Sequence, residues 1–324
     1  MTKIIYLNQN KWIDLLKQQK GQVTEYEEEL NAVKRLSETG EVIFPLSRYH
    51  SIETSSYRGG RESIDDMFRF MLDVSQAHCI APYDIVKSEE IEQEARRLLG
   101  LDFRIDEKVI SKGLPFMHAG RWSQITVDSN QDDSKLEKQL HEFSKSEEFA
   151  EKALFNSGYR SVLSDRNHEQ EAASDLEKIR EENSGKFKNN SHQRDVTTLY
   201  YHQEHIRPKV KRNVIELLLS EEMVSPLVDH GISEERLESK KYAIEYTKRF
   251  PASYTYTKLT VSRDLQRKIK SNDLNDIMAL SVAIPCCDII ITENFWTSVA
   301  NQCSLGNEYD SKIVSNLSEI SGLQ

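Results

Sequence analysis

Several features that mark familiar classes of protein are missing from this chain of 324 residues. No apolar run approaches the ~20 residues that cross a bilayer, and the first residues lack the pattern of a signal peptide. Cysteine is scarce, and the cysteines lack the paired spacing of a zinc site. They are Cys79, Cys286, Cys287 and Cys303. We therefore expect reduced thiols in a cytoplasmic protein that has no membrane partner.

The signatures of several enzyme classes are also absent. The nine histidines form no H-x-x-x-H pair and no Ser-His triad pattern, which disfavours zinc hydrolysis and Ser-His chemistry. The chain has no glycine-rich phosphate-binding loop. Its 43 Lys and Arg against 53 Asp and Glu leave a net charge of −10, which argues against a broad basic surface for nucleic acid. Brief contact with nucleic acid through a local site is compatible with this charge.

Short apolar segments alternate with amphipathic segments near both ends of the chain. Residues 4–7, 42–44 and 78–81 have the character of strands, and Ile289–Ile291 and Lys312–Val314 have it again near the end. Segments with helical spacing lie between them. This alternation predicts an α/β fold with a small parallel sheet covered by helices on both faces.

Helix boundaries are indicated by capping residues. Thr24 has the spacing of a capping box with the glutamate three residues later, and Ser47 caps the next predicted helix. Near the end of the chain, Asn272 or Asp273 begins a helix that we expect Pro285 to end.

The middle of the chain has a different texture. Residues 122–249 are long polar stretches with little strand character, which predicts a mostly helical insertion. The chain would then hold one α/β domain in two parts, 1–115 and 261–324, separated by the insertion at 116–260. Basic residues concentrate only at Arg207–Arg212 and His192–Arg194, which read either as solvated faces or as contacts to a phosphate backbone.

Polar side chains follow the predicted strands or lie on helices that face their carboxyl ends, where α/β sheets bind ligands. Asn8 follows the first strand, and Glu293 and Asn294 follow Ile289–Ile291. Glu53 lies on the helix after the second strand, and Asp276 lies in the first turn of the helix near residue 273. Carboxylates in one place repel each other unless a divalent cation binds among them, and oxygen ligands favour Mg²⁺ or Mn²⁺. Two such ions about 4 Å apart could cleave a phosphodiester.

Nearby acids read differently. Asp288 lies at the opposite end of the strand from Glu293, about 16 Å away at ~3.3 Å per residue, so we expect a structural role for it. Asp273 either assists the site or caps its helix. His50, within one turn of Glu53, either contacts substrate or packs, and the packing role is favoured.

Four segments together carry a resemblance to a known family. They are IIYLNQNKWIDLL, PLSRYHSIETS, DLNDIMALSVAIP and DIIITEN, which contain Asn8, Glu53, Asp276 and Glu293. In this order the chain resembles the PIN-like nuclease superfamily over about its first hundred residues and its last fifty or so. The resemblance implies a three-layer αβα sandwich with a small parallel sheet. It also implies metal-dependent hydrolysis of RNA, often by toxins or defence effectors.

Carried over by position, Glu53, Asp276 and Glu293 would be catalytic acids that bind Mg²⁺ or Mn²⁺. Asn8 stands where the family has an aspartate, and its amide would be a neutral ligand. Asn294 is in strict register with the fourth acid of the family, so it is a second candidate beside Glu293.

We therefore expect a metal-dependent endoribonuclease with an RNA substrate, DNA being left open, and a protein partner or inhibitor that binds through the insertion. The neutral Asn8 keeps a second reading open, in which the PIN-like domain is a catalytically silent binding or assembly module. A site for a small phosphorylated ligand is a third reading, which lacks a glycine-rich loop.

Overall fold

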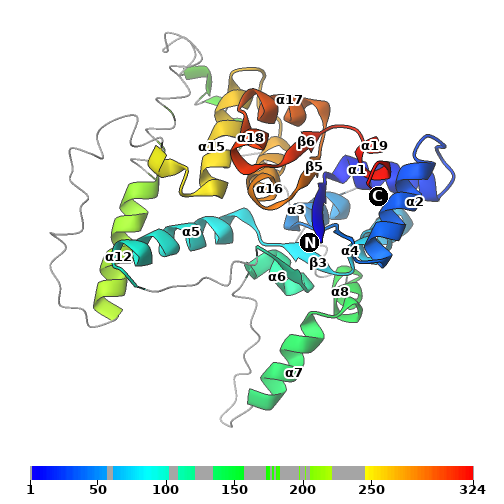
Figure 1. Ribbon diagram of the computed structural model, residues 1–324, viewed down its shortest axis with the longest axis horizontal. Coiled ribbons are helices and arrows are strands. Elements are labelled where there is room, and N and C mark those ends of the chain that lie inside the picture. The colour runs from blue at the N-terminus through cyan, green and yellow to red at the C-terminus, as the bar shows by residue number, and fades with distance from the viewer. Residues whose placement is uncertain are drawn as a thin grey trace. The chain divides into compact units, whose positions relative to one another are not determined.

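The chain is described by a computed structural model that is mostly helical around a small parallel sheet (Figure 1). The described residues are 2–56, 61–101, 109–120, 134–156, 173–175, 177–178, 180–182, 197, 201, 205–220 and 245–323. The chain divides into two compact units. Unit 1 comprises Met1–Pro82, Lys108–Glu171 and Val282–Gln324, and unit 2 comprises Tyr83–Glu107 and Ala172–Ser281. These bounds differ from the sequence-based ranges, because part of the expected insertion groups with the sheet in unit 1.

The sheet of unit 1 has four parallel strands in the order β2-β1-β5-β6. The strands are β1 (Lys3–Leu7), β2 (Val42–Ile43), β5 (Ile289–Ile291) and β6 (Lys312–Val314). All three side chains of β5 are buried, as expected for a parallel strand covered on both faces. The predicted strands and their parallel pairing are confirmed, and the two ends of the chain fold together in this sheet (Figure 1).

The direction of the chain across the sheet reverses beside β1. The chain passes from β1 outward to β2, and it later adds β5 and β6 on the other side of β1. Leu7 of β1 lies opposite Ile291 of β5, so these two strands end together. In open α/β sheets, ligands bind outside the carboxyl ends of the strands where the strand order reverses. The ends of β1 and β5 are therefore the place to look for a site.

The strand β3 (His78–Ile80) pairs with the segment of the chain that follows β2. The N–H of Leu46 donates to the carbonyl of His78 (2.9 Å), and the Leu46 carbonyl accepts from the N–H of Ile80 (2.8 Å). These bonds place β3 parallel to the chain at Leu46. The opposite edge of β3 pairs antiparallel with β4 (Ile110–Lys112), a strand that the sequence analysis did not predict.

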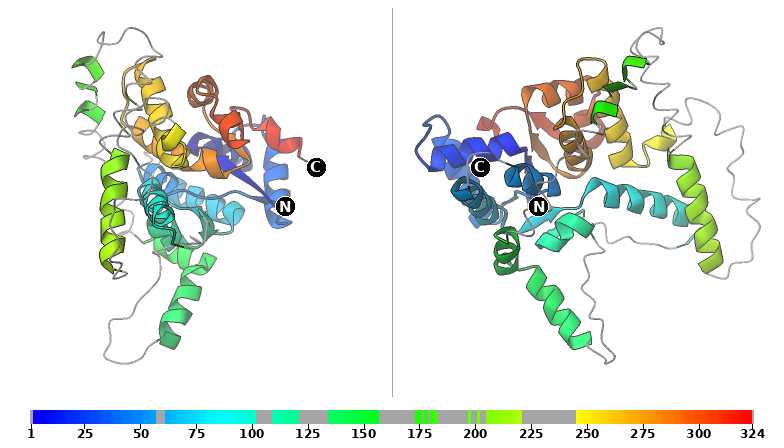
Figure 2. Two further views of the ribbon diagram at one scale, coloured as in Figure 1. Left: turned by 60° about the vertical axis from the view of Figure 1, so that its left-hand side comes forward. Right: turned by 180° about the vertical axis from the view of Figure 1, so that it is seen from behind.

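Two further views show the helices of unit 1 (Figure 2). Their buried apolar side chains confirm the expected amphipathic character, but not every expected boundary is confirmed. They are α1 (Gln9–Gln19), α2 (Glu27–Glu38), α3 (Arg48–Ser55), α4 (Arg61–Ser75), α6 (Leu114–Ala119), α7 (Ser134–Ser144), α8 (Glu147–Leu154), α17 (Asn294–Gln302), α18 (Leu305–Tyr309) and α19 (Ser318–Ser321). The capping box predicted at Thr24 is wrong, because α2 begins at Glu27 after Tyr26. The N–H of Tyr26 bonds instead to Oε1 of Gln18 on α1 (2.9 Å), so a contact with another helix fixes this entry.

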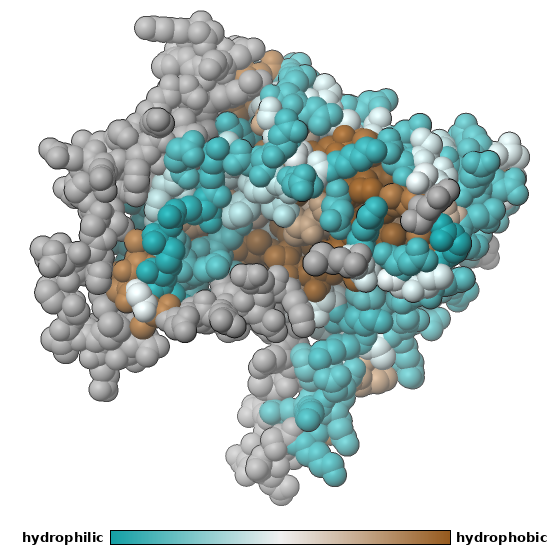
Figure 3. Space-filling view, viewed as in Figure 1, coloured by the Kyte–Doolittle hydropathy of each residue, from teal (hydrophilic) through white to brown (hydrophobic). Residues whose placement is uncertain are grey.

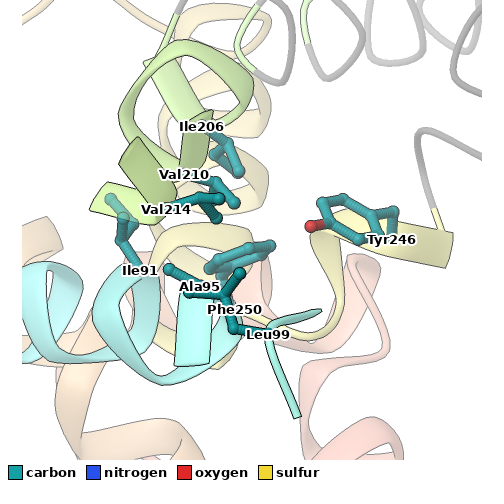
Figure 4. Close-up of a cluster of buried hydrophobic side chains, with 8 residues drawn as sticks. All are labelled: Ile91, Ala95, Leu99, Ile206, Val210, Val214, Tyr246 and Phe250. Atoms are coloured by element: carbon teal, nitrogen blue, oxygen red, sulfur yellow. The ribbon is translucent and has the colours of Figure 1, made fainter. Parts of the chain in front are cut away.

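Unit 2 is built from α5 (Tyr83–Leu98), α12 (Arg207–Ser220), α15 (Pro251–Asp264) and the first part of α16 (Asp273–Cys286). Figure 4 shows one of its apolar clusters, in which residues of α5 and α12 meet Tyr246 and Phe250. The cluster consists of Ile91, Ala95, Leu99, Ile206, Val210, Val214, Tyr246 and Phe250. Helix α16 does not end at Pro285 as predicted. It continues to Cys286, and the N–H of Cys287 still bonds the Ala283 carbonyl (2.9 Å).

The surface of the described residues is largely hydrophilic on the face shown in Figure 3. Among the described residues, the large hydrophobic side chains that are exposed are Leu136 and Phe143, both on α7. No described helix combines the length and the apolar character needed to cross a membrane.

Candidate functional site

Asn8 and Thr292 meet at the carboxyl ends of β1 and β5. The N–H of Asn8 donates to the Ile291 carbonyl (2.9 Å), which extends the pairing of the two strands by one residue. Nδ2 of Asn8 donates to Oγ1 of Thr292 (3.2 Å), and both side chains are buried. The residue first singled out from the sequence therefore lies at the point where the strand order reverses.

Asn8 also starts helix α1. It has the extended backbone of an N-cap residue, and its Oδ1 accepts from the N–H of Gln9 (2.7 Å). An asparagine at this position satisfies a backbone N–H that the helix itself leaves unpaired. Asn8 thus has a structural task in addition to any role as a ligand, and that task suits asparagine and aspartate about equally well.

Glu293 is brought to the same edge by helix α17. It is the N-cap residue of α17 and makes no side-chain cap bond. Its Oε1 accepts a hydrogen bond from Nδ2 of Asn10 on α1. Asn294 is the first residue of α17 and is exposed. The structure therefore brings together Asn8, Asn10, Thr292 and Glu293 from two adjacent strand ends.

Glu53 is connected to this edge through its neighbour. Thr54 is buried on α3, and its Oγ1 accepts from Nε2 of Gln9 (2.9 Å) at the start of α1. Glu53 precedes Thr54 and is half-buried. The other amide atom of Gln9, Oε1, is buried without a hydrogen-bond partner. This Gln9–Thr54 contact holds the segment that carries Glu53 beside the residue that follows Asn8.

Asp276 belongs to unit 2, where it lies near the start of α16 and is half-buried. Its neighbour Asp273 is buried and accepts from both terminal guanidinium nitrogens of Arg267 (2.9 and 2.6 Å) and from the N–H of Lys270 (2.8 Å). Asp273 is the first residue of α16, and its carboxylate binds Arg267 and the turn at Lys270 rather than an N–H of its own helix, so the capping role expected for it is not what the structure shows. The expectation that Asp276 meets Glu53 and Glu293 stays a prediction.

The oxygen atoms at this edge are of the kind that bind a hard cation. Among the described residues, the number of carboxylates brought together there is smaller than such a cation site needs. The edge offers carboxylate, amide and hydroxyl oxygens, the ligands that Mg²⁺ and Mn²⁺ prefer. Over the described ranges, however, no group of three or more His, Cys, Asp or Glu side chains is placed to hold a metal ion. Glu293 and the amides beside it would need a further acid, which the sequence assigns to Asp276.

Asp288 has the structural role expected for it. Its Oδ2 accepts from the N–H of Ile4 (2.7 Å), and its own N–H donates to the Ile4 carbonyl (2.9 Å). These bonds join the beginning of β5 to β1, at the end of the strand away from Glu293. Asp288 is therefore a matched control for Asp276 in mutagenesis.

His50 packs inside unit 1. Its ring stacks on Tyr6 (centroids 5.2 Å apart) and meets the edge of Trp12 (6.2 Å). Its Nδ1 accepts from the N–H of Ser47 (3.1 Å), which completes the capping box that starts α3. Burial lowers the pKa of His50 from 6.5 to about 3, against a smaller opposing effect of the Leu7 backbone, so the ring is neutral at pH 7. The packing role is confirmed.

Two polar residues of the site were missed by sequence reasoning. Gln9 and Asn10 lie in the polar cluster that follows β1, but only Asn8 was chosen because it comes first after the strand. The helical turn that begins at Gln9 is what directs Gln9 to Thr54 and Asn10 to Glu293. A helix start predicted at Asn8 would have pointed to both, since residues in the first turn surround the helix N-terminus.

No family model, no curated protein and no solved structure matches this chain. The resemblance to PIN-like nucleases is therefore carried by the four segments of the chain themselves.

Proposed function

We propose that the chain is a metal-dependent endoribonuclease of the PIN-like type, with the sheet of unit 1 forming the centre of a three-layer αβα domain. One observation carries the proposal. The strand order reverses beside β1, and at that point Asn8 bonds Thr292 while Asn10 bonds Glu293. Four polar side chains from the ends of two adjacent strands thus meet where α/β folds bind ligands.

Each residue has a part in the proposed chemistry. Glu53, Asp276 and Glu293 would hold Mg²⁺ or Mn²⁺, assisted by the amide oxygens of Asn8 and Asn294. A bound ion of this kind supplies an activated water and stabilises the leaving oxygen of a phosphodiester. Asn10, through its bond to the Glu293 carboxylate, orients that ligand.

The helix starts at this edge favour the phosphate as well. Helix α1 begins at the end of β1, and α17 begins at the end of β5. The N–H groups of a helix N-terminus and its positive dipole end stabilise nearby negative charge. A phosphodiester held there would face the side chains proposed to bind the ion.

The test is RNA cleavage by the purified chain in Mn²⁺ or Mg²⁺. We expect cutting that EDTA stops and that Asp276→Ala lowers by more than about 100-fold, the upper range for loss of an outer partner of a metal site. Asp288→Asn removes a charge from the other end of β5, keeps an oxygen that can accept from the Ile4 N–H, and should cut at the wild-type rate. Cleavage that persists both in EDTA and in Asp276→Ala would refute the proposal.

A second function is favoured by two observations at the same edge. Asn8 is neutral and serves as the cap of α1, and no cluster of three metal-binding side chains occurs in the part of the chain that the structure describes. Both suit a catalytically silent module for binding or assembly. Expression of the wild type and of Asp276→Ala in bacteria separates the two functions: growth inhibition that is lost with this single carboxylate indicates the enzyme.

A further inference from the structure

Helix α12 of unit 2 has one apolar side and one basic side. Ile206, Val210 and Val214 are buried against α5 (Figure 4). Successive residues of a helix are turned by about 100°, so Lys209 and Lys211 lie on the two flanks of the side away from that contact, with Arg212 between them. All three are exposed. We call these three residues the basic face of α12.

The two lysines of this face differ from several arginines of unit 2 whose charges are paired with carboxylates. Arg96 pairs with Glu92 (3.1 Å), while Arg97 (2.6 Å) and Arg249 (3.3 Å) both pair with Glu94. By contrast, neither Lys209 nor Lys211 forms an ion pair with any residue that the structure describes. Lys209 and Lys211 therefore place exposed positive charge on this side of α12.

A third ammonium group lies beside this face. Nζ of Lys87 on α5 lies over the rings of Tyr83 (5.7 Å) and Tyr201 (5.2 Å). The ring of Tyr83 is itself stacked on Tyr256 (centroids 4.8 Å apart), which fixes its orientation. Burial and, to a smaller extent, the charge of Lys209 lower the pKa of Lys87 from 10.5 to about 8.

Glu90, three residues along α5, attracts Lys87, but its effect on the pKa of Lys87 is smaller than the effects of burial and of Lys209. Glu90 accepts from the N–H of Ala252 (2.6 Å) and from the backbone and hydroxyl of Ser253, so its oxygens are engaged at the start of α15. Lys87 and Lys209 therefore repel each other with no carboxylate paired to either in the described part of unit 2. A bound anion would remove this repulsion.

We propose that the basic face of α12, together with Lys87, binds phosphates of the RNA backbone. The inference rests on the proposed function, because RNA is chosen as the occupant from the reaction assigned to unit 1. The chemistry fits: lysines bind phosphate as point charges, and several cations along one helix suit a chain of regularly repeated anions.

Binding can be measured separately from cutting. Fluorescence anisotropy of a labelled single-stranded RNA, in EDTA, gives the affinity of the full chain at several salt concentrations. We expect Lys209→Gln/Lys211→Gln to weaken binding by about 20-fold near 0.1 M salt and to reduce the slope of log K against log salt by about 1.4, as for two lost phosphate contacts. Lys135→Gln/Lys138→Gln on α7 changes the net charge equally and should bind like the wild type.

Lys87→Met tests the third cation. It keeps an apolar stem over the tyrosine rings and removes only the charge, so we expect a smaller loss of affinity and a slope reduced by about 0.7. Thermal melting by circular dichroism confirms that each variant is folded. An unchanged affinity in a folded Lys87→Met protein removes Lys87 from the site.

Three results would overturn the proposal. The first is no RNA binding by the wild type in EDTA, and the second is equal weakening by the α12 and α7 double variants. The third is displacement of the RNA by polyglutamate at equal charge, which would indicate an acidic protein segment as the occupant. The proposed nuclease activity fails separately: RNA binding through α12 with no cleavage in Mn²⁺ would refute the enzyme and leave this site standing.

Discussion

At the scale of single residues, Asn8 decides how the site should be understood. Its Oδ1 caps α1 and its Nδ2 bonds Thr292, so the residue serves the fold at the position where the proposed PIN-like resemblance places an acid. An aspartate could provide the same cap, and the Thr292 hydroxyl could donate to it. Compared with an aspartate, Asn8 offers a cation one negative charge fewer. The cap of α1 does not require this neutral residue.

Substitution of Asn8 separates its two tasks. Asn8→Ala removes the cap and should lower the free energy of unfolding by about 1–2 kcal/mol. Asn8→Asp keeps the cap but buries a new charge, which Mn²⁺ would neutralise, so its melting temperature should rise more in millimolar Mn²⁺ than that of the wild type. Thermal melts with and without Mn²⁺ measure this. Identical shifts in both proteins would show that no cation binds beside Asn8.

The residues of the site were predictable to the extent that local sequence positions them. Asn8 and Glu293 follow strands whose apolar character is plain in the sequence, so their place at the carboxyl edge could be expected. Asn10 could have been found from a helix start at Asn8, but its pairing with Glu293 and that of Asn8 with Thr292 could not, because these contacts depend on which strands are neighbours and on the register of β1 with β5. For Asp276, the sequence predicted the helix that carries it. It could not predict which distant residues Asp276 contacts, because no local pattern determines such contacts.

At the scale of elements, the start of α3 was predicted from local chemistry, whereas the starts of α2 and β4, which depend on contacts with other elements, were not, and the end of α16 passes one residue beyond the predicted Pro285. Ser47 begins α3 as expected, because the cap and its partner His50 lie in one turn. Thr24 does not begin α2, because Gln18 of another helix binds the N–H of Tyr26. Strand β4 was missed because its three residues gain their partner from β3, about thirty positions earlier, rather than from any pattern of their own.

His50, which is buried at the start of α3, should make the free energy of unfolding of unit 1 fall at acidic pH. The unfolded chain binds a proton at His50 below pH 6.5, whereas the folded protein does so only near pH 3. Between these values the unfolded state holds more protons, so the free energy of unfolding falls as the pH falls, by about 1.4 kcal/mol per unit from this group. Above pH 6.5 this contribution is complete.

The variant His50→Gln isolates that effect. Glutamine can accept from the Ser47 N–H as histidine does, but it does not titrate. Urea unfolding at pH 6.5, 5.5 and 4.5, followed by the fluorescence of the buried Trp12 and Trp296, should show a pH slope smaller than that of the wild type by about 1.4 kcal/mol per unit. Equal slopes in the two proteins would mean that His50 takes up its proton in the folded state.

At the scale of the whole molecule, the chain passes repeatedly between two compact units. Unit 1 is assembled from three segments and unit 2 from two, and α16 begins in unit 2 and ends in unit 1. The parallel sheet and its joined chain ends were predictable, because buried strands and their polar ends leave strong local patterns. The grouping of residues 108–171 with the sheet unit was not, because it depends on contacts between elements far apart in the sequence, such as those of β4 with β3 and of α8 with α4.

The central claim is that one divalent cation uses Asp276 together with Glu293. Calorimetric titration of Mn²⁺ into the wild type, Asp276→Asn and Asp288→Asn tests it most directly. The account predicts binding by the wild type, affinity weakened at least about 10-fold by Asp276→Asn, and no change with Asp288→Asn. Absence of Mn²⁺ binding by the wild type, or equal affinity in the wild type and Asp276→Asn, would contradict it.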